Sequence, residues 1–200
     1  MRVIAGTYRS RKLRTLHGMA LRPTSDRLRE TLFNVIGAEI QDSVFVDLFA
    51  GSGAVGIEAL SRGAHRAIFA ENHRAAAVQL RANLESLGIP MIGARDLSEK
   101  AFGGAAEIFV RDASAVIASL GERGTKVDFV FADPPYADSA AYRDVLELLG
   151  ESPLMPPGSW LILEHERRRE LPPIVEQLER VRIIEQGSTS LSIYHVARAA

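Results

Sequence analysis

The sequence contains no cysteine. Disulfide bonds and thiolate metal sites are therefore excluded, and this composition is typical of a reducing compartment. No hydrophobic run approaches about 20 residues, so the sequence predicts no membrane-spanning helix. The opening stretch, MRVIAGTYRSRKLR, lacks the apolar segment of a signal peptide. We expect a cytoplasmic protein without membrane contact.

Histidine is also scarce, and its spacing is not that of metal ligands, so we expect no metal site. The five histidines are His17, His65, His73, His165 and His195. With 200 residues, 46% of them hydrophobic and 24% charged, the chain is long enough for one α/β domain and a small appendage. Nothing in it requires more than a monomer.

Positive charge is concentrated at the N-terminus. Residues 1–30 carry a net charge of +6, and the rest of the chain carries −7. A basic segment on an acidic body can contact a phosphate backbone, although a solvated charged surface gives the same pattern. Residues 3–8 and 12–16 are predicted as short strands around a polar turn, which would form a hairpin.

A helix is predicted to begin at Ser25 or Asp26, both good N-caps. Its buried stripe would be formed by Leu28, Leu32, Val35, Ile36 and Ile40. From there strands and helices alternate. Strands are predicted at 44–49, 66–71, 107–111, 127–132, 160–164, 181–185 and 191–196, and helices at 55–61, 74–87, 113–120 and 140–149.

This alternation predicts an α/β fold, a Rossmann-like and mostly parallel seven-stranded sheet with helices on both faces. Only five residues, 186–190, separate the last two strands, too few for a crossover helix, so the last strand should be antiparallel. The glycine-rich stretch 88–106 reads as an exposed insertion to which we assign no role.

A glycine-rich stretch, DLFAGSGAVG, runs from the end of the first strand through a loop into the next helix. Gly51, Gly53 and Gly56 fit the G-x-G-x-x-G spacing of dinucleotide-binding loops, and Glu71 lies 20 residues beyond Gly51. The glycines allow a tight turn close to a ligand. Asp47, directly before the loop, would repel a pyrophosphate but suits the ammonium group or sulfonium of S-adenosylmethionine. We therefore favour this cofactor over a nicotinamide, or over a plain glycine turn.

Two further acids end predicted strands. Glu71 can accept hydrogen bonds from the ribose hydroxyls of either cofactor. Asp112 can accept one from an adenine amino group, or it can simply cap the next helix. At the end of a later strand, Glu164 and His165 could line the same pocket, and a packing or capping role fits them equally well.

The string Asp133-Pro134-Pro135-Tyr136 follows the apolar strand VDFVFA. The two prolines fix the backbone and remove two N–H donors. The Asp133 carboxylate and the Pro134 carbonyl then form a rigid pair of acceptors beside the Tyr136 ring. These groups suit an exocyclic amine on a flat base, whose two protons they would accept while the ring stacks on it.

The motifs together resemble the RsmD-type methyltransferases, which modify the exocyclic N2 amine of a guanine in bacterial small-subunit ribosomal RNA. The resemblance rests on RPTSDRLRETLFN from Arg22 to Asn34, DLFAGSGAVGIEALSRGA from Asp47 to Ala64, and DPPY from Asp133. The first motif is the specific one, because many methyltransferases share the others. The stretch before Asp112 is longer than usual for the family.

The resemblance implies a class I methyltransferase domain at 25–200 and a basic RNA-contacting element at 1–24, with ribosomal RNA or a small ribosomal subunit as partner. The catalytic candidates are Asp133, Pro134, Pro135 and Tyr136. The candidates for binding S-adenosylmethionine are Asp47, Phe49, Gly51, Ser52, Gly53, Glu71, Asn72, Asp112 and Ala113. The candidates for binding RNA are Arg9, Arg11, Lys12, Arg14, Arg22 and Thr24.

Three alternatives remain. Adenine-N6 methylation of DNA uses the same Asp-Pro-Pro-Tyr chemistry, but the chain leaves little room for a sequence-reading domain. A nicotinamide oxidoreductase fits the glycine spacing but not Asp47. A non-catalytic RNA-binding assembly factor fits the basic N-terminus but gives no reason for an intact Asp-Pro-Pro-Tyr string.

Overall fold

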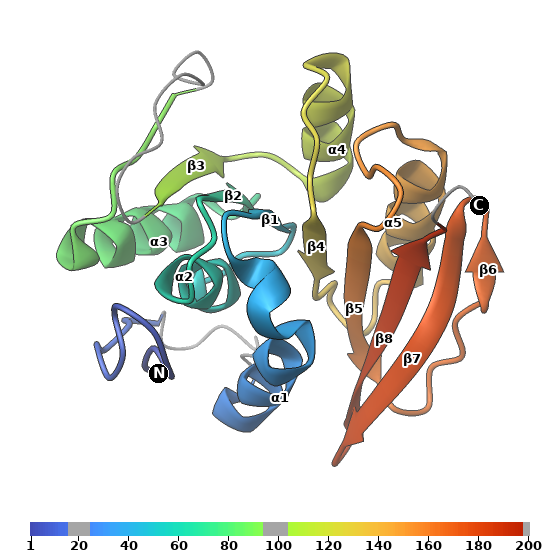
Figure 1. The fold of residues 1–200 in the computed structure, drawn as a ribbon, viewed down its shortest axis with the longest axis horizontal. Helices are drawn as coiled ribbons and strands as arrows, with labels where there is room; N and C mark the ends of the chain where they lie inside the picture. The colour runs from blue at the N-terminus through green and yellow to red at the C-terminus, as the bar shows by residue number, and fades with distance from the viewer. Residues whose placement is uncertain (16–24, 94–103, 198–200) are drawn as a thin grey trace.

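A computed structural model of the chain describes residues 1–15, 25–93 and 104–197 (Figure 1). Within these residues one eight-stranded sheet has the order β3-β2-β1-β4-β5-β8-β7-β6. The strands are β1 (Val44–Asp47), β2 (Arg66–Ala70), β3 (Ala105–Phe109), β4 (Phe129–Ala132), β5 (Trp160–Glu166), β6 (Ile174–Val175), β7 (Leu178–Gln186) and β8 (Thr189–Val196). The helices are α1 (Asp26–Ile36), the 3-10 helix η1 (Gly37–Ile40), α2 (Ala54–Ser61), α3 (Arg74–Leu87), α4 (Ala113–Glu122) and α5 (Ser139–Glu151).

The sheet confirms the mostly parallel class I methyltransferase fold expected from the sequence. Strands β3, β2, β1, β4 and β5 pair in parallel. The last strand, β8, is antiparallel to both of its neighbours, β5 and β7. The described residues contain eight strands rather than seven, because β6 adds a two-residue edge. A strand this short has no periodicity that a sequence pattern could reveal.

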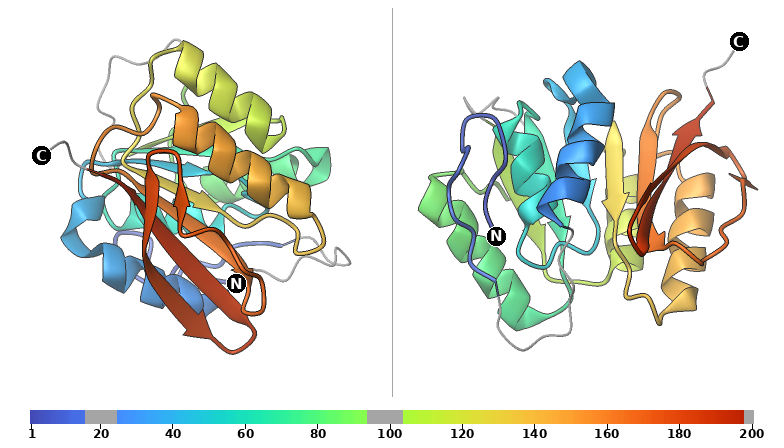
Figure 2. Two further views of the ribbon diagram at one scale, coloured as in Figure 1. Left: turned by 90° about the vertical axis from the view of Figure 1, so that its right-hand side faces the viewer. Right: turned by 90° about the horizontal axis from the view of Figure 1, so that it is seen from below.

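Helices cover the sheet on both faces (Figure 2). The core on one face joins residues of α1, α2 and α3, and the core on the other face joins residues of α4 and α5. Side chains alternate along each strand, so Phe129 and Phe131 of β4 enter the first core and Val130 and Ala132 the second. Because parallel strands end at one edge, the residues that follow β1, β2, β3 and β4 gather there.

Helix α1 begins where the sequence predicted. The side chain of Ser25 caps it by accepting a hydrogen bond from the Leu28 N–H at 3.1 Å. Of the expected stripe, Val35 is only partly buried, and Phe33 is buried although the stripe did not include it. None of the described helices is long and apolar enough to cross a bilayer.

Residues 1–15, called the arm below, fold back on themselves with only one antiparallel bridge, between Arg2 and Lys12. The expected pair of strands is therefore reduced to a bridged turn. The arm packs on the body rather than standing apart, because Val3 and Leu13 are buried in the core beneath it. A Cβ on Gly6 would lie 1.7 Å from the Ser61 carbonyl oxygen, so only glycine allows this approach to α2.

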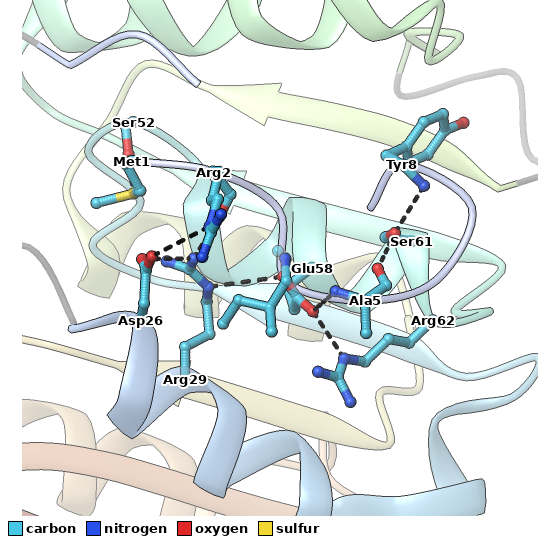
Figure 3. A network of polar contacts seen from close by, with 12 residues as sticks. Met1, Arg2, Ala5, Tyr8, Asp26, Arg29, Ser52, Glu58, Ser61 and Arg62 are labelled. Atoms are coloured by element: carbon cyan, nitrogen blue, oxygen red, sulfur yellow. Dashed lines mark hydrogen bonds and ion pairs between the residues drawn. The ribbon is translucent and has the colours of Figure 1, made fainter. Parts of the chain in front are cut away.

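A buried ion-pair network fastens the arm to the helices (Figure 3). The Glu58 carboxylate in α2 accepts the backbone N–H groups of Ile4 at 2.8 Å and Ala5 at 3.0 Å. The Arg29 side chain, fully buried in α1, donates to the Arg2 carbonyl at 2.6 Å. Burial lowers the pKa of Arg29 from its ordinary value. Not every N-terminal cation is therefore available to a ligand.

Candidate functional site

A cavity of about 590 Å³ opens at the carboxyl ends of the parallel strands. The loops after β1, β2, β3 and β4 form its walls, and its size is that of a small-molecule site. Within the part of the chain that the structure describes, six carboxyl groups line this cavity against a single arginine, Arg111. The six belong to Asp47, Glu71, Asp112, Asp133, Asp138 and Asp144.

The glycine loop after β1 is shaped by its backbone. Gly53 has a positive φ of 80° and precedes the first residue of α2. Its N–H donates to the Ala50 carbonyl at 2.7 Å, which closes a tight turn. A Cβ on Gly53 would lie 2.2 Å from the Leu80 side chain of α3. The loop can therefore lie against α3 only with glycine at this position.

Asp47, the last residue of β1, is buried beneath this loop, with 1% of its surface exposed. Its Oδ2 accepts the Gly56 N–H at 3.1 Å. Burial is the main cause that raises the pKa of Asp47 to about 7, and the nearby negative charge of Glu71 contributes. A cation bound beside Asp47 would lower this pKa again, because it stabilises the charged carboxylate.

Glu71 follows β2 and uses both carboxylate oxygens on the backbone. Oε2 accepts the Gly51 N–H at 2.8 Å, and Oε1 accepts the His73 N–H at 2.7 Å. Each oxygen retains a second lone pair, so two ligand hydroxyls can still be bound. Glu71 therefore shapes the glycine loop as well as lining the cavity, which its position in the sequence did not indicate.

Asp112, beyond β3, caps α4. Its Oδ1 accepts the Ala115 N–H at 2.8 Å, and the residue also lines the cavity. The structure thus gives Asp112 the capping role, while contact with a ligand at this wall stays a prediction. The preceding residues 94–103 of the predicted insertion lie outside the described part of the chain.

Asp133 leaves the end of β4 on the same face of the sheet as Phe131, and it lines the cavity. Burial raises its pKa well above the ordinary value, and the negative charges of Glu164 and Asp47 raise it further. A carboxylate with a raised pKa is a better proton acceptor than an exposed one. Asp133 is therefore suited to receive a proton in the cavity.

Side chains distant in sequence hold the rest of the Asp-Pro-Pro-Tyr loop. The Tyr142 hydroxyl donates to the Pro134 carbonyl at 3.1 Å. Arg169, from the loop after β5, donates to the Tyr136 carbonyl at 2.6 Å and packs its guanidinium 4.2 Å from the centre of the Tyr142 ring. The Tyr136 hydroxyl lies 3.1 Å from the Thr189 hydroxyl at the start of β8.

These contacts refine the predicted pair of acceptors. The Pro134 carbonyl is not unoccupied, because Tyr142 already uses one of its two lone pairs. Pro134 is buried, Pro135 is exposed and lines the cavity, and Tyr136 is half-buried. The stacking role expected of the Tyr136 ring stays a prediction.

The cavity brings together most of the predicted site residues. Those that line it are Asp47, Phe49, Gly51, Ser52, Glu71, Asn72, Asp112, Ala113, Asp133 and Pro135. Gly53, Pro134 and Tyr136 belong to the same two loops but do not line the cavity. The basic candidates Arg9, Arg11, Lys12 and Arg14 lie exposed on the arm, and the Arg11 side chain donates to the Ser86 carbonyl at 2.7 Å. Arg22 and Thr24 lie outside the described residues.

Sequence reasoning missed several residues of the wall. Met1 and Thr15 of the arm line the cavity, as do Asp138 and Asp144 beside the Asp-Pro-Pro-Tyr loop. Asp138 caps α5, which a capping pattern could have indicated. Met1 and Thr15 carry no such signal, because only the packing of the arm brings them to the cavity.

Glu164 and His165, left open by the sequence, are both buried at the end of β5. The two ring nitrogens of His165 lie 2.9 Å from the Ser192 hydroxyl and 2.8 Å from the Glu166 carbonyl. His165 therefore belongs to the packing between β5 and β8. Glu164 acts on the cavity through its charge, which raises the pKa of Asp133.

The family model of Conserved hypothetical protein 95 matches residues 1–195. The chain belongs to this family. A Bacillus subtilis protein named as an rRNA methyltransferase, YlbH, is 34% identical over 97% of this chain and 98% of its own length. The Ribosomal RNA small subunit methyltransferase D of Escherichia coli is 36% identical over 87% of this chain and 79% of its own length. These matches confirm the resemblance to the RsmD-type family.

Solved structures agree with this membership. A methyltransferase structure named yhhF, from Escherichia coli, superposes with a TM-score of 0.80 at 34% identity and covers 98% of both chains. An RNA methyltransferase of Salinibacter ruber, solved with S-adenosyl-L-homocysteine, superposes with a TM-score of 0.59 at 17% identity, over 89% of this chain and 95% of its own. The second likeness bears on the fold alone.

Proposed function

We propose that this protein transfers a methyl group from S-adenosylmethionine to the exocyclic N2 amine of a guanine in small-subunit ribosomal RNA. One observation carries the proposal: the Asp-Pro-Pro-Tyr loop and the glycine loop open into the same cavity. A methyl donor and an amine held by these two loops would meet there. Family membership supports ribosomal RNA as the substrate, because relatives are named as ribosomal RNA methyltransferases.

The charges of the cavity fit this cofactor. S-adenosylmethionine carries an ammonium and a sulfonium and no phosphate, and it supplies an electrophilic methyl group. The Asp47 carboxylate suits these positive charges and would repel a pyrophosphate, and Glu71 can accept hydrogen bonds from the ribose hydroxyls. We propose that Asp47, Phe49, Gly51, Ser52, Glu71, Asn72, Asp112 and Ala113 contact the cofactor, with Gly53 shaping the loop.

The Asp-Pro-Pro-Tyr loop would act on the amine. The lone pair of an exocyclic guanine amine is conjugated into the base, so the nitrogen is a weak nucleophile. Hydrogen bonds from its two protons to Asp133 and to the remaining lone pair of Pro134 would favour a pyramidal nitrogen. S-adenosylmethionine would supply the methyl group and leave as S-adenosylhomocysteine, and Asp133 or water would take the proton that the methylated amine loses.

We propose that the arm, with residues 16–24, contacts RNA phosphates through Arg9, Arg11, Lys12, Arg14 and Arg22, with Thr24 beside them. Reversing the charge of Arg9, Arg11, Lys12 and Arg14 together should weaken RNA binding and flatten its dependence on salt. Affinity for S-adenosylhomocysteine measured without RNA should stay the same. An equal loss of both affinities would contradict this role of the arm.

The decisive experiment is transfer of labelled methyl from S-adenosylmethionine to small ribosomal subunits that lack the modification, with naked DNA in parallel. Nucleoside mass spectrometry should find N2-methylguanosine in the subunit RNA, and Asp133→Ala should abolish it. N6-methyladenine in the DNA would instead establish a DNA methyltransferase. Absence of product on both substrates would overturn the proposal.

A further inference from the structure

Asn83, in α3, belongs to no motif of the sequence, yet it connects two functional parts of the molecule. Its side chain is buried, with 1% exposed. Its Nδ2 donates to the backbone carbonyls of Ser52 at 2.9 Å and Arg14 at 3.0 Å. Its Oδ1 accepts the backbone N–H of Arg14 at 2.9 Å. One amide therefore joins the glycine loop to the arm.

The Asn83 amide nitrogen uses both of its hydrogens in hydrogen bonds. The Asn83 Oδ1 also lies 3.4 Å from the Gln79 amide nitrogen. Water has little access to replace a lost bond at a buried site, so leaving one group unsatisfied is costly. Neither the glycine loop nor the arm can move away without losing hydrogen bonds at Asn83.

The two segments that Asn83 holds both face ligands in the proposed function. Ser52 lines the cavity and follows Gly51, whose N–H is bound to Glu71. Arg14 presents an exposed side chain from the arm. Thr15, the next residue, lines the cavity itself. The arm is therefore part of the cavity wall at the point where Asn83 holds it.

A second contact reinforces this link. The Ser52 hydroxyl lies 3.6 Å from the Met1 sulfur, and Figure 3 shows the two side chains facing each other. Glu58, which holds the backbone of Ile4 and Ala5, belongs to the helix that begins directly after the glycine loop. The arm is thus tied to the glycine loop near both ends of the arm, at Met1 and at Arg14.

We propose that Asn83 is a positioning residue that fixes the arm relative to the glycine loop, so that cofactor and RNA strengthen each other's binding. The inference rests on the proposed function, which places the cofactor in the loop and RNA on the arm. Cofactor bound against Ser52 holds the Asn83 bonds in place and thereby orders Arg14. Linkage then requires RNA to strengthen cofactor binding by the same factor.

The test is a measurement of that factor in both directions. Equilibrium dialysis gives the affinity for labelled S-adenosylhomocysteine with and without saturating small ribosomal subunits that lack the modification. Filter binding gives the affinity for the subunits with and without S-adenosylhomocysteine. In the unaltered protein each ligand should tighten the other by about fivefold or more, the usual range for coupled sites.

Asn83→Ala should bring this factor close to one, because the arm and the loop then move separately. Gln177→Ala is a control away from both ligands: the Gln177 amide, at an exposed position, also bridges two backbone carbonyls, those of Leu149 and Ser152. It should leave the factor unchanged. Asn83→Asp, of the same shape but lacking the two donors, provides a second variant should Asn83→Ala unfold.

Two results would overturn the inference: no mutual tightening in the unaltered protein, which needs no variant, or full tightening in a folded Asn83 variant. Methyl transfer from S-adenosylmethionine, measured separately with the same protein preparations, distinguishes these results from the proposed function. Transfer to ribosomal RNA without mutual tightening removes only the role of Asn83. Absence of transfer to ribosomal RNA in the unaltered protein removes the proposed function.

Discussion

The glycine loop after β1 and the Asp-Pro-Pro-Tyr loop after β4 face one cavity but are held in different ways. The glycine loop is held through its own backbone N–H groups. Asp47 accepts the N–H of Gly56, and Glu71 accepts the N–H of Gly51. Both acceptors lie at strand ends within about 20 residues of the groups they bind, so these two supports come from the same βαβ unit as the loop, and Asn83 of α3 adds a bond to the Ser52 carbonyl.

The Asp-Pro-Pro-Tyr loop offers fewer backbone donors, because proline has no N–H. It is held through its carbonyls and its tyrosine hydroxyl instead. Its partners come from three distant elements. They are Tyr142 of α5, Arg169 of the loop after β5, and Thr189 of β8. We therefore expect changes near the first loop to affect cofactor binding, and changes near the second to affect turnover.

The largest effect should follow Gly53→Ala. The new Cβ would meet the Leu80 side chain at 2.2 Å, and φ is +80°. Strain and overpacking together should lower the free energy of unfolding by about 3 kcal/mol and abolish binding of S-adenosylhomocysteine. Denaturant unfolding and calorimetry measure the two effects. Gly187→Ala, at φ +64° in open space, is the control and should cost about 1 kcal/mol with binding intact.

The second effect concerns the other loop. Arg169→Ala removes the donors to the Tyr136 carbonyl and to the Ser139 hydroxyl, and the ring contact with Tyr142. A misplacement of the reacting groups by about 1 Å lowers the reaction rate about 100-fold. We therefore expect kcat for methyl transfer to fall by roughly that factor.

Affinity for S-adenosylhomocysteine should stay unchanged in Arg169→Ala. The neighbouring exposed Arg168 offers a control, because Arg168→Ala leaves the loop contacts in place. A loss of cofactor affinity as large as the loss of kcat would show that the two loops are not supported separately.

The same contrast explains how far the sequence was informative. The glycine loop, Asp47, Glu71 and the cap of α1 depend on neighbours along the chain, and their positions follow from spacing alone. The parallel pairing of the first five strands follows from the alternation of strands and helices, whereas their order in the sheet does not. The residues on the cavity wall that carry a motif were therefore predictable.

Contacts between distant segments were not predictable from spacing. Arg169 stands in a run of charged residues that reads as a solvated loop, yet it reaches the Tyr136 carbonyl. Arg29 reads as part of a basic surface, yet it is fully buried against Glu58. Asn83 lies on the buried face of α3, where the helical pattern marks no polar role. In each case tertiary packing decides the role, and no local pattern records it.

The third effect is a pH dependence at the glycine loop. Burial raises the pKa of Asp47 from 3.8 to about 7, and a cation binds only the deprotonated form. Affinity for S-adenosylmethionine should therefore rise about tenfold from pH 6 to pH 8 and then level off. Calorimetry at several pH values checks this, and Asp47→Asn should bind weakly with the slope removed.

The raised pKa also affects the ligand-free protein. Between about pH 4 and pH 7, Asp47 keeps a proton in the folded chain that it has released in the unfolded chain. Its contribution to the stability of the folded state is therefore fully present only below about pH 4. That contribution is lost as the pH rises through about 7.

An affinity for S-adenosylmethionine that is flat between pH 6 and 8 would contradict a contact between Asp47 and the positive charge of the cofactor.

The smallest effect should come from Tyr142→Phe, which removes one hydrogen bond to the Pro134 carbonyl. Tyr194→Phe is a matched control, because the buried Tyr194 hydroxyl donates to the Pro172 carbonyl at 2.8 Å, away from the cavity. Each variant should lose about 1 kcal/mol of unfolding free energy. Only Tyr142→Phe should lower kcat, by a few-fold, because only the Pro134 carbonyl lies in the loop that we propose to hold the amine. Equal kcat in the two variants would mean that Pro134 serves the fold and not the reaction, and the amine would then depend on Asp133 alone.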